Sequence, residues 1–166
     1  PELSLERPKP VPFGGEDQLP YRNRFRVYYE DTDTQGITYH VAYVRYCERA
    51  LFDLARTLFP EMPTDAWMQR YRAGVASVDV RYLNASHLGD RIEVMTGVVE
   101  VSSHRMSFGH RIVLQETGKV LADAMSEVEF RDDDERLVQV PRSFVDLGMG
   151  DLAGRSGQPG PGGRSE

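Results

Sequence analysis

The feature that most constrains the fold is a change in hydrophobic period along the chain. Within residues 38–60, apolar side chains recur at spacings of three and four, the period of one helical face. These positions are Tyr43, Cys47, Ala50, Leu51, Leu54 and Leu58. Within residues 76–130 the period becomes two, in four runs separated by turn sequences. The sequence therefore predicts one long amphipathic helix followed by four consecutive strands.

Two further elements complete the predicted fold. F-R-V-Y-Y-E, residues 25–30, is rich in β-branched and aromatic residues and predicts a strand ahead of the helix. A short second helix is predicted at residues 64–72, with Thr64 as its cap. This order indicates an α+β domain, in which an antiparallel sheet packs on one main helix. One helix covers a sheet only partly, so we expect self-association, with a ligand site between subunits.

The ends of the chain differ from its middle. Residues 1–20 contain five prolines and predict an extended N-terminal arm. Residues 148–166 are rich in glycine and proline and nearly free of large apolar side chains, which predicts a flexible tail. A single folded domain is therefore expected at residues 21–147, long enough to bury a core.

Charge and composition narrow the functional classes. A formal net charge of -6 argues against a protein that mainly coats nucleic acid. Cys47 is the single cysteine, so no internal disulfide is possible and a reducing cytoplasm fits best. No apolar run approaches the ~18–20 residues of a membrane span, and the N-terminus lacks a signal-peptide stretch. We therefore expect a soluble, cytoplasmic protein without membrane insertion.

The segment D-T-D-T-Q-G, residues 31–36, begins like a calcium-binding loop. Such loops place oxygen ligands at positions one, three and five and a bidentate Glu at position twelve. Asp31 and Asp33 fit, but Gln35 is a poor ligand and Ala42 occupies the twelfth position. A strand pattern, rather than a helix, precedes the loop. We therefore expect no calcium site here.

Other catalytic centres find equally little support. His87, His104 and His110 lack a metal-ligand spacing, and there is no CxxC or HExxH motif. No G-x-S-x-G elbow is present, and Cys47 lies on the apolar face of the helix, where thiols are usually inert. Neither a metal nor another cofactor is predicted.

Asp33 remains as a candidate catalyst. If the helix starts at residues 38–40, its unpaired N–H groups and positive dipole end face the loop that carries Asp33. N–H groups of this kind can hold the oxyanion formed when a carbonyl, such as that of a thioester, is attacked. Asp33 would then act as nucleophile or as base for water. Spacing alone leaves the alternative open that Asp33 only caps the helix or closes the turn.

The segment Y-Y-E-D-T-D-T-Q-G-I-T-Y-H-V-A-Y-V-R-Y-C-E-R-A, residues 28–50, resembles the signature of hotdog-fold acyl-CoA thioesterases. It is most similar to the 4-hydroxybenzoyl-CoA thioesterase branch, and within it to bacterial acyl-CoA thioesterases encoded beside the Tol-Pal genes. The matching positions are Asp31, Asp33, Gly36, Ile37, Tyr39, His40, Tyr43, Glu48 and Arg49. H-L-G-D-R-I-E-V and E-R-L-V-Q-V-P resemble later family segments.

The resemblance implies a long helix wrapped by an antiparallel sheet. It also implies homodimers with sites at the subunit interface, often assembled into homotetramers. Asp33 matches the catalytic carboxylate, and the backbone N–H near His40 would polarise the thioester carbonyl. The histidine that matches His40 is also implicated in the site. Asp31 is expected to shape the turn.

Several residues are expected to contact the acyl-CoA substrate. Gly36, Ile37 and Tyr39 lie in the matched motif, while Arg105 and Ser107 are candidates for the CoA phosphates. The chain departs from the family pattern at Gln35 and Thr38, where smaller or apolar residues are usual. These departures leave the acyl-chain preference undetermined, but they do not change the predicted reaction.

The predicted reaction is hydrolysis of an acyl-CoA thioester to free acid and CoA. One alternative is a hydrolase of acyl groups on an acyl-carrier protein, and another is a non-catalytic acyl-CoA-binding module. Hotdog-fold hydratases resemble D-x-N-P-L-H, with Asp and His five residues apart. Here Asp33 and His40 are seven apart, which argues against a hydratase.

Overall fold

The structure, a computed structural model, describes residues 13, 15–58 and 72–146. The main elements are β1 (Tyr21–Arg26), α1 (His40–Leu58), β2 (Ala73–Tyr82), β3 (Arg91–Val101), β4 (Arg105–Leu114) and β5 (Val120–Phe130). Short 3-10 helices lie at η1 (Glu16–Gln18) and η2 (Tyr29–Asp31), and residues 142–146 are helical. The long helix and the four strands after it confirm the change of period seen in the sequence.

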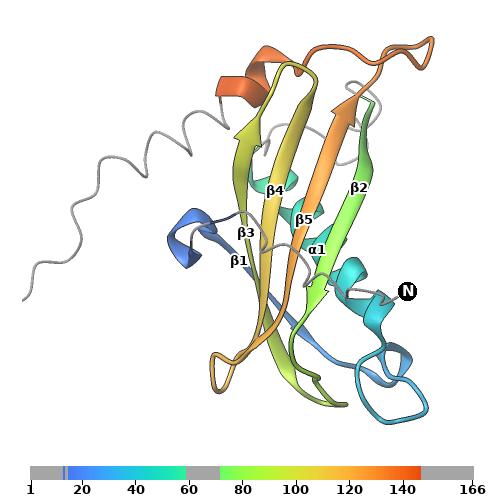
Figure 1. The fold of residues 1–166 in the computed structure, drawn as a ribbon, viewed down its shortest axis with the longest axis vertical. Coiled ribbons are helices and arrows are strands. Elements are labelled where there is room, and N and C mark those ends of the chain that lie inside the picture. Colours follow the sequence, from blue (N-terminus) through green and yellow to red (C-terminus); the bar gives the residue numbers. More distant parts are fainter. Residues whose placement is uncertain (1–12, 14, 59–71, 147–166) are drawn as a thin grey trace, which may run out of the picture.

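The five strands form one antiparallel sheet in the order β1-β3-β4-β5-β2. The α1 helix lies across one face of this sheet, behind the strands in Figure 1. We call that face the inner face and the opposite one the outer face. β1 and β2 are the edge strands, so β2 pairs with β5 alone among the described strands. This arrangement confirms the predicted α+β class.

The strand predicted at residues 25–30 was wrong in its position. β1 occupies Tyr21–Arg26, and the chain then turns through η2. The carboxylate of Asp31 accepts a hydrogen bond from the Tyr28 N–H at 3.0 Å. This bond stabilises the turn, although the aromatic residues favour an extended strand. The predicted second helix at residues 64–72 lies almost wholly outside the described residues, as do the predicted tail and residues 1–12.

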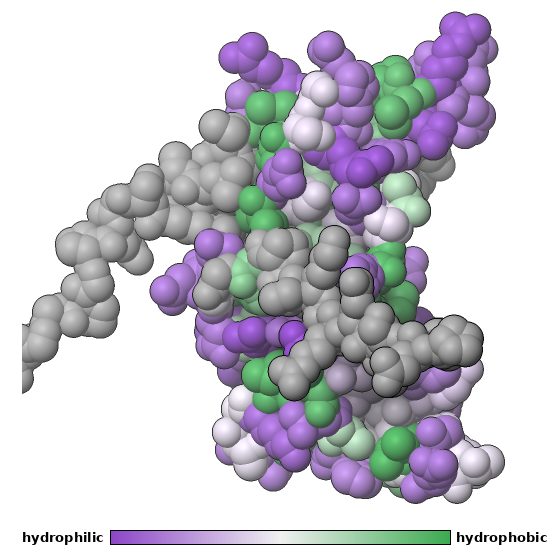
Figure 2. All heavy atoms as spheres, viewed as in Figure 1, coloured by the Kyte–Doolittle hydropathy of each residue, from purple (hydrophilic) through white to green (hydrophobic). Residues whose placement is uncertain are grey.

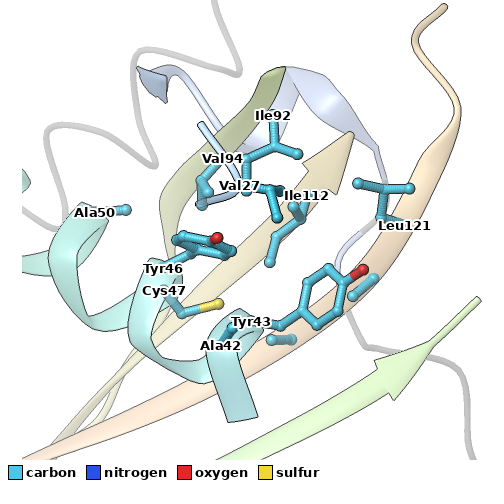
Figure 3. Close-up of a cluster of buried hydrophobic side chains, with 12 residues drawn as sticks. Val27, Ala42, Tyr43, Tyr46, Cys47, Ala50, Ile92, Val94, Ile112 and Leu121 are labelled. Carbon is cyan, nitrogen blue, oxygen red and sulfur yellow. The ribbon is translucent and has the colours of Figure 1, made fainter. Parts of the chain in front are cut away.

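The main core lies between α1 and the inner face. Tyr43, Tyr46 and Cys47 of the helix pack on Ile92, Val94, Ile112 and Leu121 of the central strands (Figure 3). The Tyr46 ring also stacks on Phe25, with 5.5 Å between centroids. Burying each large apolar side chain contributes roughly 1.5–3 kcal/mol, so this contact fixes the helix on the sheet. The predicted apolar stripe is thus the packed face of α1.

The outer face is covered in its centre by residues that precede β1. Phe13 and Leu19 pack there against Met95 and Val113. Gly109 permits this contact, because a Cβ atom at that position would lie 2.8 Å from Phe13 Cδ1 and 3.1 Å from Leu19 Cδ2. Leu19 belongs to the segment predicted as an extended arm, yet it is fully buried. As a result, residues 92–98 of β3 are buried on both faces.

Around that apolar patch, the outer face is lined by ion pairs. Glu93 is bonded to Arg22 and Arg24, Asp123 to Arg111, and Glu129 to Arg105 and Arg131. Figure 2 views the molecule from this side and shows mainly hydrophilic side chains. None of the described helices is long and apolar enough to cross a membrane.

Candidate active site

The segment between β1 and α1 is shaped by Asp31. Its side chain is almost fully buried and accepts the Tyr28 N–H, while its backbone carbonyl accepts the Tyr39 N–H at 2.7 Å. These two bonds join the start and the end of the loop that carries Asp33. Asp31 therefore shapes the turn, as the sequence predicted.

Asp33 lies at the first position of a tight turn. Its carbonyl accepts the Gly36 N–H at 3.0 Å, and its own N–H donates to the Ile37 carbonyl at 2.9 Å. Gly36 has φ +75, a left-handed conformation that a side chain would disfavour. Asp33 Oδ1 accepts the Gln35 N–H at 2.8 Å. One carboxylate oxygen thus closes the turn, which is part of the structural role left open above.

The second oxygen of Asp33, Oδ2, has no hydrogen-bond partner among the described residues. No ion pair with a described lysine, arginine or histidine involves Asp33 either. The side chain is half-buried. A carboxylate oxygen in this state is free to accept a proton from water or to attack a carbonyl carbon.

The N-terminus of α1 supplies unpaired donors beside this loop. The Thr38 N–H donates to the Ser86 carbonyl at 2.8 Å, and the Tyr39 N–H is taken by Asp31. The next two N–H groups, those of His40 and Val41, meet no acceptor in the described part of the chain. Unpaired N–H groups at a helix start carry partial positive charge and favour an anion there. The predicted helix start at residues 38–40 is confirmed.

Aromatic side chains surround the helix start. The His40 ring lies 4.4 Å from the Tyr39 ring and 6.1 Å from the Tyr82 ring, measured between centroids. The Tyr82 hydroxyl donates to the His40 carbonyl at 2.9 Å, which ties β2 to the first turn of α1. Tyr39 and Tyr82 are both more than two-fifths exposed. The loop and helix start thus bring Asp33, Gly36, Ile37, Tyr39 and His40 into one region.

Arg105 and Ser107 lie elsewhere in the chain. They alternate with the core residues Met106 and Phe108, so they face the outer side of the sheet. β4 begins at the end of the sheet opposite the 32–39 loop (Figure 1). Both residues line a hollow of about 270 Å³ that also includes Glu127 and Glu129.

The charge of Arg105 is already matched within the chain. Its guanidinium lies 2.8 Å from Glu129 and 3.2 Å from Glu127, and the hydrogen bond to Glu129 above all raises the pKa of Arg105. The structure therefore does not bring Arg105 and Ser107 together with Asp33 inside one chain.

The structure adds residues that the sequence did not single out. Ser86 binds Thr38 and Tyr43, and Tyr82 binds the helix start. Ser86 follows N-A in a stretch that predicts only a loop, so no local pattern marks it. Burial raises the pKa of the Cys47 thiol to about 12, which agrees with its predicted inert role. In the described residues, no group of three His, Cys, Asp or Glu side chains is arranged to hold a metal.

Solved structures share this fold. The chain superposes on a 1,4-dihydroxy-2-naphthoyl-CoA thioesterase from Synechocystis with a TM-score of 0.67, at 17% identity over 78% of this chain and 95% of the other. A thioesterase from Thermus thermophilus, complexed with coenzyme A and Zn, gives a TM-score of 0.68, at 20% identity over 86% and 98% of the two chains. The architecture is therefore the hotdog fold of thioesterases.

Sequence comparison defines the family. Residues 27–147 match the model of the thioesterase-like superfamily, and the chain belongs to that superfamily. The acyl-CoA thioesterase YbgC of Helicobacter pylori is 35% identical over 80 residues, which are 47% of this chain and 56% of the relative. The acyl-CoA thioester hydrolase YbgC of Escherichia coli O6:H1 is 34% identical over 94 residues, 56% and 69% of the two chains. The match thus spans just over half the length of the Helicobacter relative.

Proposed function

We propose that the protein hydrolyses an acyl-CoA thioester to a free acid and CoA. One observation carries this proposal. Asp33 Oδ2 has no partner among the described residues, and its loop leads directly into the N–H groups of His40 and Val41, which meet no acceptor there either. A carboxylate and an oxyanion site are the two groups that thioester hydrolysis requires. The family match and the names of the YbgC relatives support the same reaction.

The N–H groups of His40 and Val41 bind the carbonyl oxygen and stabilise its negative charge as the carbon becomes tetrahedral. In one route, Asp33 removes a proton from water, whose oxygen bonds to the carbonyl carbon. In the other, Asp33 Oδ2 bonds to that carbon itself and forms an anhydride, which water then cleaves. In both routes the C–S bond breaks and the thiolate leaves. In the first route, protonated Asp33 gives its proton to the thiolate; in the second, the proton released when water cleaves the anhydride goes to the thiolate.

Gly36, Ile37, Tyr39 and His40 are proposed to contact the acyl-thioester end of the substrate. All four belong to the segment that positions Asp33, and the Tyr39 and His40 side chains are exposed there. Arg105 and Ser107 remain candidates for binding the CoA phosphates. Their position on the outer face, away from Asp33, counts against this role and makes it a point to test. The proposed reaction uses no metal or other cofactor.

A panel of thioesters tests the proposal. Aliphatic and aromatic acyl-CoAs, and the same acyl groups on an acyl-carrier protein, are supplied to the enzyme while a thiol-reactive dye detects the released thiol. We expect turnover with at least one acyl-CoA and a higher kcat/KM for CoA than for carrier-protein thioesters. A higher kcat/KM for carrier-protein thioesters would identify the alternative hydrolase. Binding of acyl-CoA without any thiol release would identify a non-catalytic module.

The proposal includes a homo-oligomer, in which a second copy covers β2. This edge strand leaves Val78 and Tyr82 exposed on the inner face, beside the partly buried Val80. An open strand edge with apolar side chains is a surface that another chain can pair with. Light scattering after gel filtration measures the mass, and a Val78→Lys variant is expected to lower it. If the variant keeps the mass of the wild type, β2 does not form the subunit interface. If the wild type is itself a monomer, the proposed homo-oligomer is wrong.

A further inference from the structure

Ser86, in the connection between β2 and β3, is the centre of a buried cluster of hydroxyl groups. Its Oγ lies 2.6 Å from Thr38 Oγ1 and 2.9 Å from the Tyr43 hydroxyl. Its carbonyl accepts the Thr38 N–H at 2.8 Å, and its N–H donates to the Tyr43 hydroxyl at 3.3 Å. All three residues are buried, and Ser86 is fully so. The cluster therefore joins three separate segments away from water.

The position of this cluster relates it to the candidate active site. Thr38 lies between the turn of Asp33 and the first helical residue, His40. Tyr43 lies one turn into α1. The bonds to Ser86 thus hold both the end of the loop and the start of the helix against one point in the connection between β2 and β3. A displacement of Thr38 would move Asp33 relative to the N–H groups of His40 and Val41.

Apolar side chains of similar size would fill the same space without the expense of burying hydroxyls. Hydrogen bonds differ from such packing because they fix direction and distance, and a buried network is rigid when its members are satisfied. The Thr38 and Tyr43 hydroxyls are both satisfied by Ser86. This is the property expected of a support for a catalytic geometry rather than of a simple core contact.

We propose that Thr38, Ser86 and Tyr43 are positioning residues, which hold the Asp33 carboxylate at its working distance from the helix N–H groups. The inference rests on the proposed thioesterase function. None of the three hydroxyls acts on the substrate; each acts through the backbone of the loop or the helix. Their loss lowers the rate of the chemical step and leaves substrate binding largely intact.

Thr96 provides a matched control. Its hydroxyl is also fully buried and lies 3.0 Å from His110 Nδ1, in the centre of the sheet. Thr96→Val and Thr38→Val each remove one buried hydrogen bond while keeping the shape of the side chain. Only Thr38 is part of the segment that carries Asp33. A general loss of stability would affect both variants alike, whereas loss of positioning would affect Thr38→Val alone.

The experiment measures kcat and KM of Thr38→Val, Thr38→Ser and Thr96→Val with the best acyl-CoA of the panel. We expect Thr38→Val to lose about tenfold in kcat, because misplacements of about 1 Å or less reduce rates by up to about 10²-fold. Its KM should change less than about twofold, since the effect is on the transition state. Thr38→Ser keeps the hydroxyl and should restore most of kcat. Thr96→Val should keep kcat while its Tm falls as far as that of Thr38→Val.

Amide hydrogen exchange at residues 33–41 gives a readout that needs no activity. Exchange should be faster in Thr38→Val than in the wild type and unchanged in Thr96→Val. Unchanged exchange or unchanged kcat in Thr38→Val overturns the inference, as does an equal loss of kcat in Thr96→Val. If Thr38→Val does not fold, Tyr43→Phe removes a hydroxyl of the same cluster and is read in the same way. A wild type inactive on every thioester refutes the proposed function, while the exchange data still decide whether the cluster holds the loop.

Discussion

Carboxylates occupy two contrasting environments in this molecule. On the outer face of the sheet, Glu93 and Asp123 are each bonded to arginine, and Asp123 receives two hydrogen bonds from Arg111 at 2.8 and 3.0 Å. In the loop before α1, Asp33 has no ion pair with a described residue and keeps one oxygen free. The contrast separates acidic groups whose charge is matched by the fold from one whose charge is left available.

The difference indicates where chemistry can occur. A carboxylate between guanidinium groups is a weak base and a poor nucleophile, because its lone pairs are engaged in strong hydrogen bonds. Among the described residues, Asp33 instead has only the backbone donor of Gln35. The start of α1 follows this loop, and its His40 and Val41 N–H groups, which meet no acceptor among the described residues, favour a negative charge there. Paired carboxylates thus lie on the outer face of the sheet, whereas Asp33 lies in the loop before α1 with one oxygen that has no partner among the described residues.

Asp33→Asn should show the largest effect on activity. The amide cannot take a proton from water or form an anhydride, so we expect kcat to fall by about 10³-fold, within the usual range for removal of a general base. The Gln35 N–H bond can still be made by the amide oxygen, so Tm should change little. Thiol release under saturating acyl-CoA, together with thermal unfolding, measures both quantities.

Asp123→Asn is the matched control on the outer face. It weakens the pairing with Arg111, so the free energy of unfolding should fall by about 1 kcal/mol while kcat stays at the wild-type value. Wild-type kcat in Asp33→Asn would remove Asp33 from the mechanism. A loss of kcat in Asp123→Asn equal to that of Asp33→Asn would remove the contrast between the two regions.

His40→Ala should have a smaller effect than Asp33→Asn. The exposed imidazole is lost, but the backbone N–H groups of His40 and Val41 remain. We expect kcat to fall by about tenfold, below the range of 10²–10⁴ for a group that transfers a proton. His104→Ala, at an exposed histidine between β3 and β4, should leave kcat unchanged. If kcat of His40→Ala instead falls as far as that of Asp33→Asn, the His40 imidazole itself is essential.

The sequence predicted the parts of the fold that depend on local periodicity. The stripe from Tyr43 to Leu54 requires one buried helical face, and the period-two runs require strands with a buried side, so α1 and β2 to β5 were found. The strand before the helix was misplaced because the side-chain bond of Asp31 outweighs the β propensity of Tyr28 and Tyr29. Such a bond is specific to one conformation and leaves no periodic trace.

The candidate site was predicted only where its residues are close in sequence. Asp33 and the helix start are separated by a few residues, so their juxtaposition followed from the position where the helix begins. Ser86 reaches Thr38 across 48 positions, and Tyr82 reaches His40 across 42. Contacts at such separations depend on how the sheet is ordered, which no local pattern encodes. The buried Leu19 was missed for the same reason, since its partners Met95 and Val113 lie far along the chain.

Glu93→Gln should change stability rather than activity. Burial of Glu93 favours its neutral form, but hydrogen bonds and charges from Arg22 and Arg24 outweigh burial and hold the pKa of this carboxyl below its usual value. A lowered folded-state pKa stabilises the protein fully above the unfolded pKa of about 4.3, and this stability is lost as the pH falls through the folded pKa.

We therefore expect Glu93→Gln to lower the free energy of unfolding by about 1 kcal/mol at neutral pH, with the difference from the wild type shrinking below about pH 4. Urea unfolding at several pH values measures it. Because both arginines are half exposed or more, added salt should also reduce the difference. A difference that is constant from pH 7 to about pH 3 would show that the ion pairs do not stabilise this face.

Arg105→Gln should have the smallest effect and decides whether the outer face has a part in substrate binding. The guanidinium is already bonded to Glu127 and Glu129, so a phosphate would have to compete with two carboxylates for it. On this basis KM for acyl-CoA should rise by no more than about twofold, the loss of one screened surface contact. The matching acyl-pantetheine thioester, which lacks the nucleotide phosphates, should give the same ratio of variant to wild type. If KM instead rises by about tenfold for acyl-CoA and not for acyl-pantetheine, Arg105 binds a CoA phosphate, and the division between a structural outer face and a reactive loop no longer holds.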